Sequence, residues 1–151
     1  MAEPERLFTL ASLLVVPGWL LLVVAPRWRW SARLVGPVIL PMLLSALYIA
    51  SIALHLPHVQ GGFGSLAEVR LLFSEDWILL AGWIHYLAFD LFVGCWQVRD
   101  SQRLGISHFI VAPCLLLTFV AGPIGLLSYL LVRILRRRAE IEPLPEPSAV
   151  A

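Results

Sequence analysis

Four long stretches of the chain are almost free of charged side chains, and each is long enough to cross a bilayer as a helix. They cover residues 7–26, 34–54, 77–98 and 109–132. About 20 apolar residues in helical conformation span the roughly 30 Å hydrocarbon core, and a segment in lipid must satisfy its backbone hydrogen bonds internally. The sequence therefore predicts an all-α fold, an integral membrane four-helix bundle.

The composition and length agree with one membrane domain. Of the 151 residues, 60% are hydrophobic and 14% charged, whereas soluble domains are about half apolar and about a quarter charged. We place the transmembrane domain at residues 1–135 and expect a basic, then Pro- and Glu-rich disordered tail over 136–151. A net charge of +1 gives no attraction to nucleic acid. The first stretch exceeds the about 7–15 apolar residues of a signal peptide, so we interpret it as a helix.

The connection between the second and third stretches, residues 57–76, differs from the short ones. Its glycines are typical of a turn. Ser65 and Glu68 have the spacing of a capping box, which marks the start of a helix. Apolar residues then fall on one face of this helix: Leu66, Val69, Leu72 and Phe73. We therefore expect a short amphipathic helix at the membrane interface between helices two and three.

Asp90 lies deep in the third stretch, 13 residues beyond Trp77. A carboxylate at the centre of a bilayer costs at least ~2.5–3.5 kcal/mol, so such residues face the interior of a bundle and are commonly functional. We expect no arginine at the same depth, and low-dielectric surroundings favour the neutral carboxyl. Asp90 is therefore a candidate general acid. The alternative is a structural hydrogen bond to Thr118, Ser45 or a tryptophan indole.

Helical spacing selects the neighbours of Asp90. One stripe of the third helix carries Trp83, Tyr86, Asp90, Gly94 and Gln97. His85 points about 140° away from Asp90, so both side chains reach one ligand only if it is wedged between helices; otherwise His85 is a hydrogen-bonded spacer. We assign candidate catalytic roles to Asp90, His85 and Tyr86.

Prolines in the second and fourth helices predict breaks that would open a pocket. Pro123 removes a backbone hydrogen bond and kinks the fourth helix; Pro37 and Pro41 predict a similar break in the second. Gly122, with Gly125 and Ser128, could instead form a ridge of small residues for close packing. The predicted pocket is apolar and aromatic, which suits a lipid-like or polyene ligand. Its expected ligand-binding residues are Trp83, Gly94, Gln97, Thr118, Gly122 and Pro123.

The histidines and cysteines predict no metal site. His55 and His58 are separated by Pro57, which we expect to end the second helix, so a shared face is not assured. His85 has no second histidine at its depth, which argues against haem. Cys95 and Cys114 lie in apolar segments, where thiols are typically small packing residues. The cofactor stays unknown.

Two stretches of sequence resemble a known family. Residues 73–77, Phe-Ser-Glu-Asp-Trp, and 83–92, Trp-Ile-His-Tyr-Leu-Ala-Phe-Asp-Leu-Phe, resemble the membrane domain of the abscisic-acid-deficient-four-like family. The Gly-Pro-Ile-Gly run at 122–125 fits its fourth helix, and the resemblance covers about residues 34–135. In plants this family is required for making neoxanthin, an allenic xanthophyll, from violaxanthin in plastid membranes. The resemblance therefore implies a carotenoid-related membrane protein.

That chemistry suits the candidate residues. Opening an epoxide to an allene needs an acid to protonate the oxygen and a base to remove a vinylic proton. We expect Asp90 to act as the acid, with His85 or Tyr86 assisting, in an isomerase or an accessory to one. Because no transit peptide precedes the first helix, we expect a multi-pass protein of a bacterial cytoplasmic membrane.

Two other functions stay open. One is a non-enzymatic scaffold or lipid-binding accessory; the other is a small transporter or proton path, which we rank last because only His85 and Asp90 are deep and ionisable. The expected partner is a membrane lipid or carotenoid-like ligand, and a homo-oligomer or a biosynthetic partner is compatible with the sequence. With four crossings both termini share one side, and the arginines divide six to five. We favour cytoplasmic termini because of the cluster at 133–138.

Overall fold

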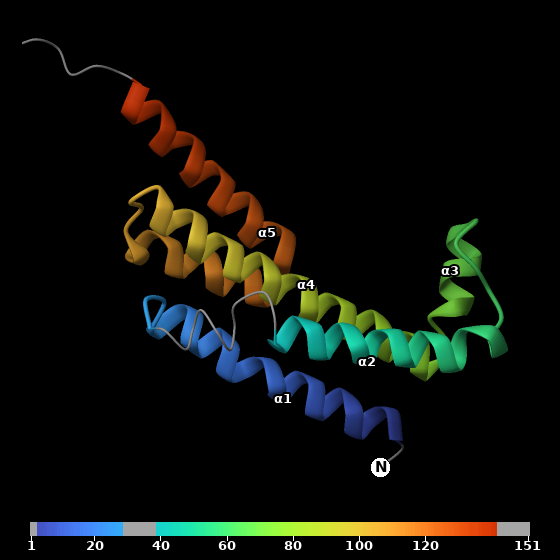
Figure 1. Ribbon diagram of the computed structural model, residues 1–151. Coiled ribbons are helices and arrows are strands. Elements are labelled where there is room, and N and C mark those ends of the chain that lie inside the picture. The colour runs from blue at the N-terminus through green and yellow to red at the C-terminus, as the bar shows by residue number, and fades with distance from the viewer. Residues whose placement is uncertain (1–2, 29–38, 142–151) are drawn as a thin grey trace, which may run out of the picture.

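The computed structural model describes residues 3–28 and 39–141 and contains only helices within them (Figure 1). The elements are α1 Glu3–Val24, α2 Ile39–His55, the 3-10 turn η2 Leu56–His58, α3 Leu66–Leu72, α4 Asp76–Arg103 and α5 His108–Ile141. Four of them, α1, α2 with its 3-10 turn, α4 and α5, are long and apolar enough to cross a membrane. The predicted all-α membrane fold is confirmed.

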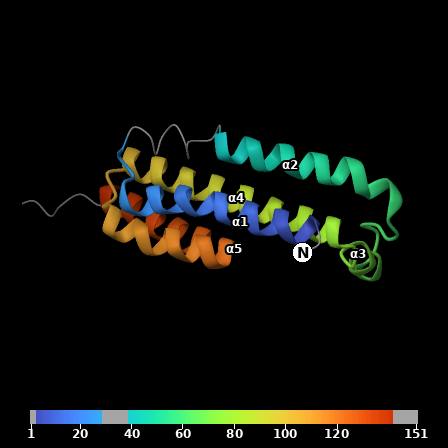
Figure 2. The same ribbon diagram turned by 90° about the horizontal axis from the view of Figure 1, so that it is seen from below.

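Helix α4 lies at the centre of the molecule, with α1, α2 and α5 packed around it (Figures 1 and 2). Helix α1 runs in the same direction as α4: the Phe8 ring contacts Trp83 near the start of α4, and the Pro26 carbonyl accepts a hydrogen bond from Gln102 near its end (3.0 Å). Helix α1 therefore lies along α4 from near its start to near its end, and 12 of the 28 residues of α4 are buried.

Helix α2 runs antiparallel to α4. The His55 ring, at the end of α2, stacks on Trp77 at the start of α4, with centroids 4.2 Å apart. The predicted break at Pro41 is not found, because this proline lies in the first turn of one continuous helix, where its missing N–H has no partner to lose. Pro37 lies outside the described residues.

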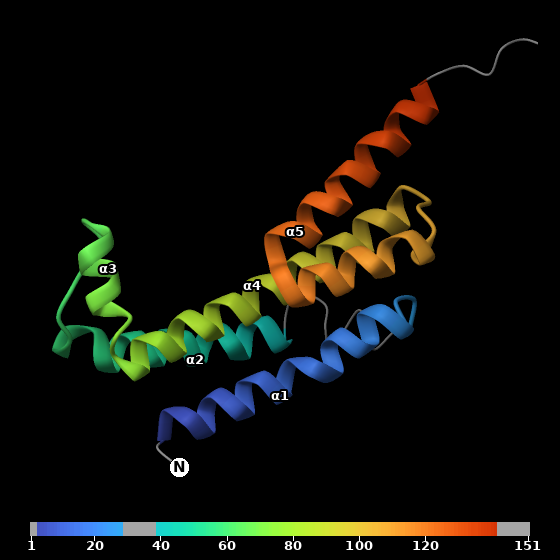
Figure 3. The same ribbon diagram turned by 180° about the vertical axis from the view of Figure 1, so that it is seen from behind.

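Helix α5 is broken in the middle. Ala121 (φ −148°, ψ 49°) and Gly122 (φ 5°, ψ −77°) leave the helical conformation, directly before Pro123. The backbone of Gly125 lies against that of Thr118, although a straight helix separates residues seven apart by about 10 Å. The two halves, residues 108–120 and 123–141, therefore form a hairpin, visible as the orange and red arms of α5 in Figure 3.

Contacts with α4 show that the second half of α5 runs back the way the first half came. Thr118 shares a hydrogen bond with Gln97, and Arg133 forms an ion pair with Asp100, three residues further along α4. In a straight α5 these partners would lie about 22 Å apart along the axis. The predicted kink is thus a reversal of the chain.

The reversal changes the topology that four straight crossings predict. The N-terminal end of α1 lies beside the start of α4, and the second half of α5 ends beyond its other end (Figure 1). The expectation that both termini share one side is therefore wrong for the described residues. The first half of α5 has 13 residues, about 20 Å, which is short of the roughly 30 Å hydrocarbon core.

The short helix α3 is capped as its sequence indicates. The Ser65 hydroxyl accepts a hydrogen bond from the Glu68 N–H (3.2 Å), and the Glu68 carboxylate accepts one from the Gly64 N–H (3.0 Å). Leu72 is buried, whereas Leu66 is exposed, so α3 covers the α2–α4 end of the molecule with its C-terminal turn. Helix α5 continues to Ile141, past the boundary expected at residue 135, and residues 142–151 lie outside the described part.

Candidate functional site

The predicted stripe on α4 faces α1 and α5, in the interior of the fold. The Trp83 indole N–H donates to the Ser12 hydroxyl on α1 (2.9 Å). The Tyr86 hydroxyl donates to the Phe119 carbonyl on α5 (3.2 Å), which is one of the carbonyls that the break in α5 leaves without a helical partner. The aromatic half of the stripe therefore connects α4 to both neighbours.

The other half of the stripe is closely packed. A Cβ atom at Gly94 would lie 2.8 Å from the Trp19 ring, so this glycine admits an α1 side chain and leaves no space for a ligand. The Gln97 amide donates to the Thr118 hydroxyl (2.9 Å), and both side chains are fully buried. These three residues, predicted to bind a ligand, lie in contacts between α4 and its neighbouring helices.

Asp90 points inward, towards the break in α5. A Cβ atom at Gly122 would lie 2.5 Å from Asp90 Oδ1, so the carboxyl rests against the backbone where the second half of α5 begins. The phenol of Tyr86 lies next to it. Oδ2 of Asp90 is buried and has no hydrogen-bond partner within the described residues. Gly122 is thus required by the close approach of the acid.

A large cavity lies beside the first half of α4, nearer to Asp76, at the start of this helix, than to Asp90. It has a volume of about 760 Å³ and is enclosed by the start of α1, the end of α2, α3 and α4. Most of its lining is apolar or aromatic, including Phe8, Ile52, Leu72, Phe73 and Leu79. Asp90, Gly94, Gln97, Thr118, Gly122 and Pro123 do not line it, so the expected pocket around Asp90 is displaced by about two turns of α4.

Two candidate catalytic residues, His85 and Tyr86, do line this cavity, as does Trp83. The His85 ring stacks on Phe89 with centroids 4.4 Å apart. Within the described part of the chain its ring nitrogens have no hydrogen-bond partner, so the interpretation of His85 as a hydrogen-bonded spacer finds no bond to support it. An imidazole in an apolar cavity is available to a polar group of a ligand.

The sequence did not identify several residues of the cavity. Tyr48 of α2 lies across from His85, with ring centroids 5.7 Å apart, and Phe63 and Phe73 come from the segment around α3. The sequence feature that could have indicated these residues is Phe63, an aromatic residue within a glycine-rich turn; in the structure its side chain is exposed. His55 is not part of the site: its Nδ1 is hydrogen-bonded to the Ser51 carbonyl (2.9 Å).

A smaller cavity of about 280 Å³ lies between α2 and the middle of α4, and Ser45 is among its lining residues. Ser45, one of the possible hydrogen-bond partners of Asp90 in the structural alternative, therefore faces this cavity. Cys95 and Cys114 are buried thiols without a disulfide.

A comparison with known protein families assigns the chain to one of them. The family model described as ABA DEFICIENT 4-like matches residues 6–129, more than four fifths of the chain. The chain belongs to the ABA DEFICIENT 4-like family. The match begins within α1, so it includes this helix as well as the residues that carry the resemblance, and the resemblance seen in the sequence is confirmed. No curated protein and no solved structure matches the chain. Its helices make it an integral membrane protein; the bacterial cytoplasmic membrane stays a prediction.

Proposed function

We propose that this protein binds the end group of a carotenoid or a related isoprenoid lipid in the cavity beside the first half of α4. The observation that supports the proposal most is an apolar cavity of about 760 Å³ whose lining includes His85, an imidazole with no hydrogen-bond partner in the described part of the chain. Small-molecule sites occupy roughly 300–1,000 Å³ and combine apolar walls with few polar groups. Membership of the ABA DEFICIENT 4-like family favours a carotenoid over other lipids.

The polar groups of the cavity suit an oxygenated ring. His85 and Tyr86 lie next to each other in sequence and both line the cavity. The His85 imidazole can donate a hydrogen bond to a ring hydroxyl or epoxide oxygen, whereas the Tyr86 oxygen, whose own O–H is donated to Phe119, can accept one from a ring hydroxyl. The surrounding aromatic rings provide flat apolar surfaces for a conjugated chain. Binding would orient the oxygen of the end group towards α4.

We further propose that the bound end group is isomerised. Opening an epoxide to an allenic alcohol breaks one C–O bond, protonates that oxygen and removes one C–H proton, so that no atom is gained or lost. His85 and Tyr86 would contact the reacting atoms. Asp90 lies behind Tyr86, against Gly122, and would act as a positioning residue rather than as the acid that the sequence suggested.

The binding proposal is tested by the pigment that co-purifies with the protein. The variant Leu79→Trp fills the cavity, and Leu116→Trp is a matched control, because both leucines are 54% exposed and Leu116 lines neither cavity. After expression in a carotenoid-producing bacterium and mild detergent extraction, the wild type and Leu116→Trp should retain pigment, measured by absorbance and chromatography. Leu79→Trp should lose most of it. Equal retention, or a wild type free of pigment, contradicts the proposal and favours a scaffold.

The isomerisation proposal is tested separately with an epoxy-carotenoid supplied by the host. His85→Gln should lower both pigment retention and conversion, since its imidazole contacts the ligand. Asp90→Asn should retain pigment and lose conversion, and Asp90→Glu should restore part of it. Unchanged product from Asp90→Asn removes Asp90 from the mechanism, and absence of any conversion in the wild type leaves a binding protein.

A further inference from the structure

The reversal in α5 gathers most of the arginines at one end of the molecule. Seven described arginines lie at the end of α4 marked by Arg103, and two lie at the other end, Arg6 and Arg70. The seven are Arg27, Arg99, Arg103, Arg133, Arg136, Arg137 and Arg138. Four straight crossings would have divided the eleven arginines almost equally.

The acidic residues show the opposite distribution. The described part of the arginine-rich end contains two acids, Asp100 and Glu140. The other end contains five: Glu3, Glu5, Glu68, Glu75 and Asp76. Among the described residues, charge is therefore divided along the axis of α4, basic at one end and acidic at the other, although the net charge of the chain is only +1.

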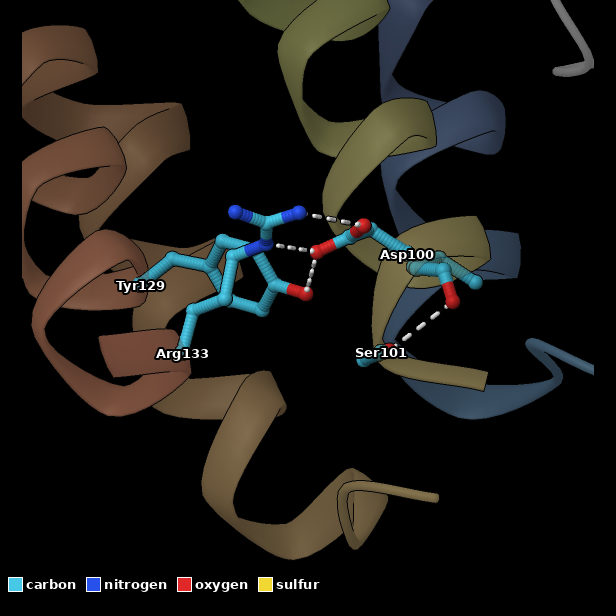
Figure 4. Close-up of polar contacts among 5 residues, drawn as sticks. Asp100, Ser101, Tyr129 and Arg133 are labelled. Atoms are coloured by element: carbon cyan, nitrogen blue, oxygen red, sulfur yellow. Dashed lines mark hydrogen bonds and ion pairs between the residues drawn. The ribbon is translucent and has the colours of Figure 1, made fainter. Parts of the chain in front are cut away.

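Specific contacts hold the basic end together. Asp100 accepts hydrogen bonds from the Tyr129 hydroxyl (2.8 Å) and from Arg133 Nε (2.7 Å), which fixes the second half of α5 against α4 (Figure 4). Gln102 donates a hydrogen bond to the Pro26 carbonyl. Arg27, the residue that follows Pro26, therefore lies at the same end. These contacts bring α1, α4 and α5 together at the basic end.

Asp100 forms its ion pair with one of these arginines, Arg133. Arg27, Arg99, Arg103 and Arg136 are exposed. Guanidinium groups bind phosphate through paired, charge-assisted hydrogen bonds. Arg27, Arg99 and Arg103 lie at the ends of α1 and α4, which are long and apolar enough to cross a membrane, and the ion pair between Arg133 and Asp100 brings the second half of α5 to the same end. The ends of membrane-crossing helices lie at the level of the phosphate layer of a bilayer. Because these arginines lie at the level of the lipid phosphates, we favour lipid headgroups over nucleic acid as their ligand, although nucleic acid is also a polyanion.

We propose that this end of the molecule lies at the cytoplasmic surface and that its exposed arginines, Arg27, Arg99, Arg103 and Arg136, bind the headgroups of anionic phospholipids. Loops and helix ends rich in arginine stay on the cytoplasmic side during insertion, and anionic lipid attracts juxtamembrane basic residues. The start of α1, α3 and the cavity beside the first half of α4 then belong to the opposite side. The proposal does not depend on the ligand proposed above.

The orientation is tested with a C-terminal fluorescent-protein fusion and with cysteines added to a variant in which Cys95 and Cys114 are replaced by alanine. The exposed Gln60 of the acidic end and the exposed Ser107 of the basic end are changed to Gln60→Cys and Ser107→Cys. In intact cells an impermeant maleimide should label Gln60→Cys and not Ser107→Cys, and the fusion should fluoresce. Labelling of Ser107→Cys overturns the proposal. So does a C-terminal fluorescent-protein fusion that stays dark while a C-terminal fusion to a secreted phosphatase is active, because that phosphatase works only outside the cytoplasm.

Lipid binding is tested on the purified full chain in detergent, with added phosphatidylglycerol or phosphatidylcholine. Phosphatidylglycerol should raise the Tm by roughly 3 °C or more, with a smaller rise at high salt. The double variant Arg103→Gln/Arg136→Gln should lose most of this rise, and the matched double variant Arg6→Gln/Arg70→Gln should keep it. The proposal is contradicted if phosphatidylglycerol raises the Tm of all three proteins equally, or if phosphatidylcholine raises it as much. It is also contradicted if nucleic acid co-purifies with the protein and suppresses the rise in Tm.

Discussion

Helices α4 and α5 show how differently two apolar helices of one chain can be used. Helix α5 is the more hydrophobic: its most apolar segment of 18 residues has a mean hydropathy of 2.3, against 1.7 for the corresponding segment of α4. Yet half of the residues in the α4 segment are buried in the fold, against a third of those in the α5 segment. Helix α4 crosses the whole molecule without a break and carries Asp90, whereas α5 turns back beside that acid. Hydropathy therefore indicates that a segment is compatible with lipid, and does not give its path.

The difference has a physical cause at the point where the helices meet. A break inside a membrane leaves backbone carbonyls and N–H groups without helical partners, and these are costly unless the surrounding protein satisfies them. Tyr86 of α4 donates to one of these carbonyls, that of Phe119, and Asp90 lies against Gly122. The straight helix thus stabilises the broken one.

The largest effect is expected where the two arms of α5 touch. Gly125→Val places a branched side chain into the backbone of Thr118, which the hairpin cannot accommodate without opening. We expect a loss of about 3 kcal/mol or more in the free energy of unfolding, measured by thermal unfolding in detergent. Ile124→Val, at an exposed neighbouring position, is the control. A normal Tm for Gly125→Val would show that the arms do not lie in contact.

The next effect concerns the buried contact between the first arm and α4. Gln97→Ala removes the hydrogen bond to Thr118 and leaves a cavity at a fully buried position. The expected cost is about 2–3 kcal/mol, and Thr118→Val should cost less because only one hydroxyl is removed. If both variants unfold at the wild-type temperature, the first arm is not anchored at this point.

A smaller effect is expected at the contact that holds the second arm. Tyr129→Phe removes the hydrogen bond to Asp100 and keeps the ring that packs on Trp96, so about 1 kcal/mol should be lost. Arg133→Gln should lower the Tm as well. A double-mutant cycle between Arg133→Gln and Asp100→Asn should show coupling, and additive effects would mean that the two side chains do not interact.

The smallest effect distinguishes the role of the proline from that of the tertiary contacts. Pro123 lies in the first turn of the second arm, where proline is favoured and no N–H bond is lost. Pro123→Ala should therefore cost less than about 1 kcal/mol and leave a C-terminal fluorescent fusion in its original compartment. If the fusion moves to the other side, the proline itself directs the reversal.

Much of the fold follows from local sequence. The lengths of the apolar stretches predict the helices, and Ser65 with Glu68 predicts the start of α3, because these features depend on neighbours in the chain. The candidate site was predicted in part. His85 and Tyr86 line the cavity, but Tyr48 and Phe73 come from other elements, and no spacing along α4 indicates which side chains of α2 or α3 face it.

The sequence by itself determined that this chain is a helical membrane protein of the ABA DEFICIENT 4-like family, with one deep acid on an inward stripe. It also determined that a break occurs near Pro123, because a missing N–H is a property of the residue. Only the tertiary structure decided that the break reverses the chain, which depends on contacts between residues far apart, Thr118 with Gln97 and Arg133 with Asp100. The same contacts decided that the arginines gather at one end, since charge along a chain becomes charge in space only when the path of the backbone is known.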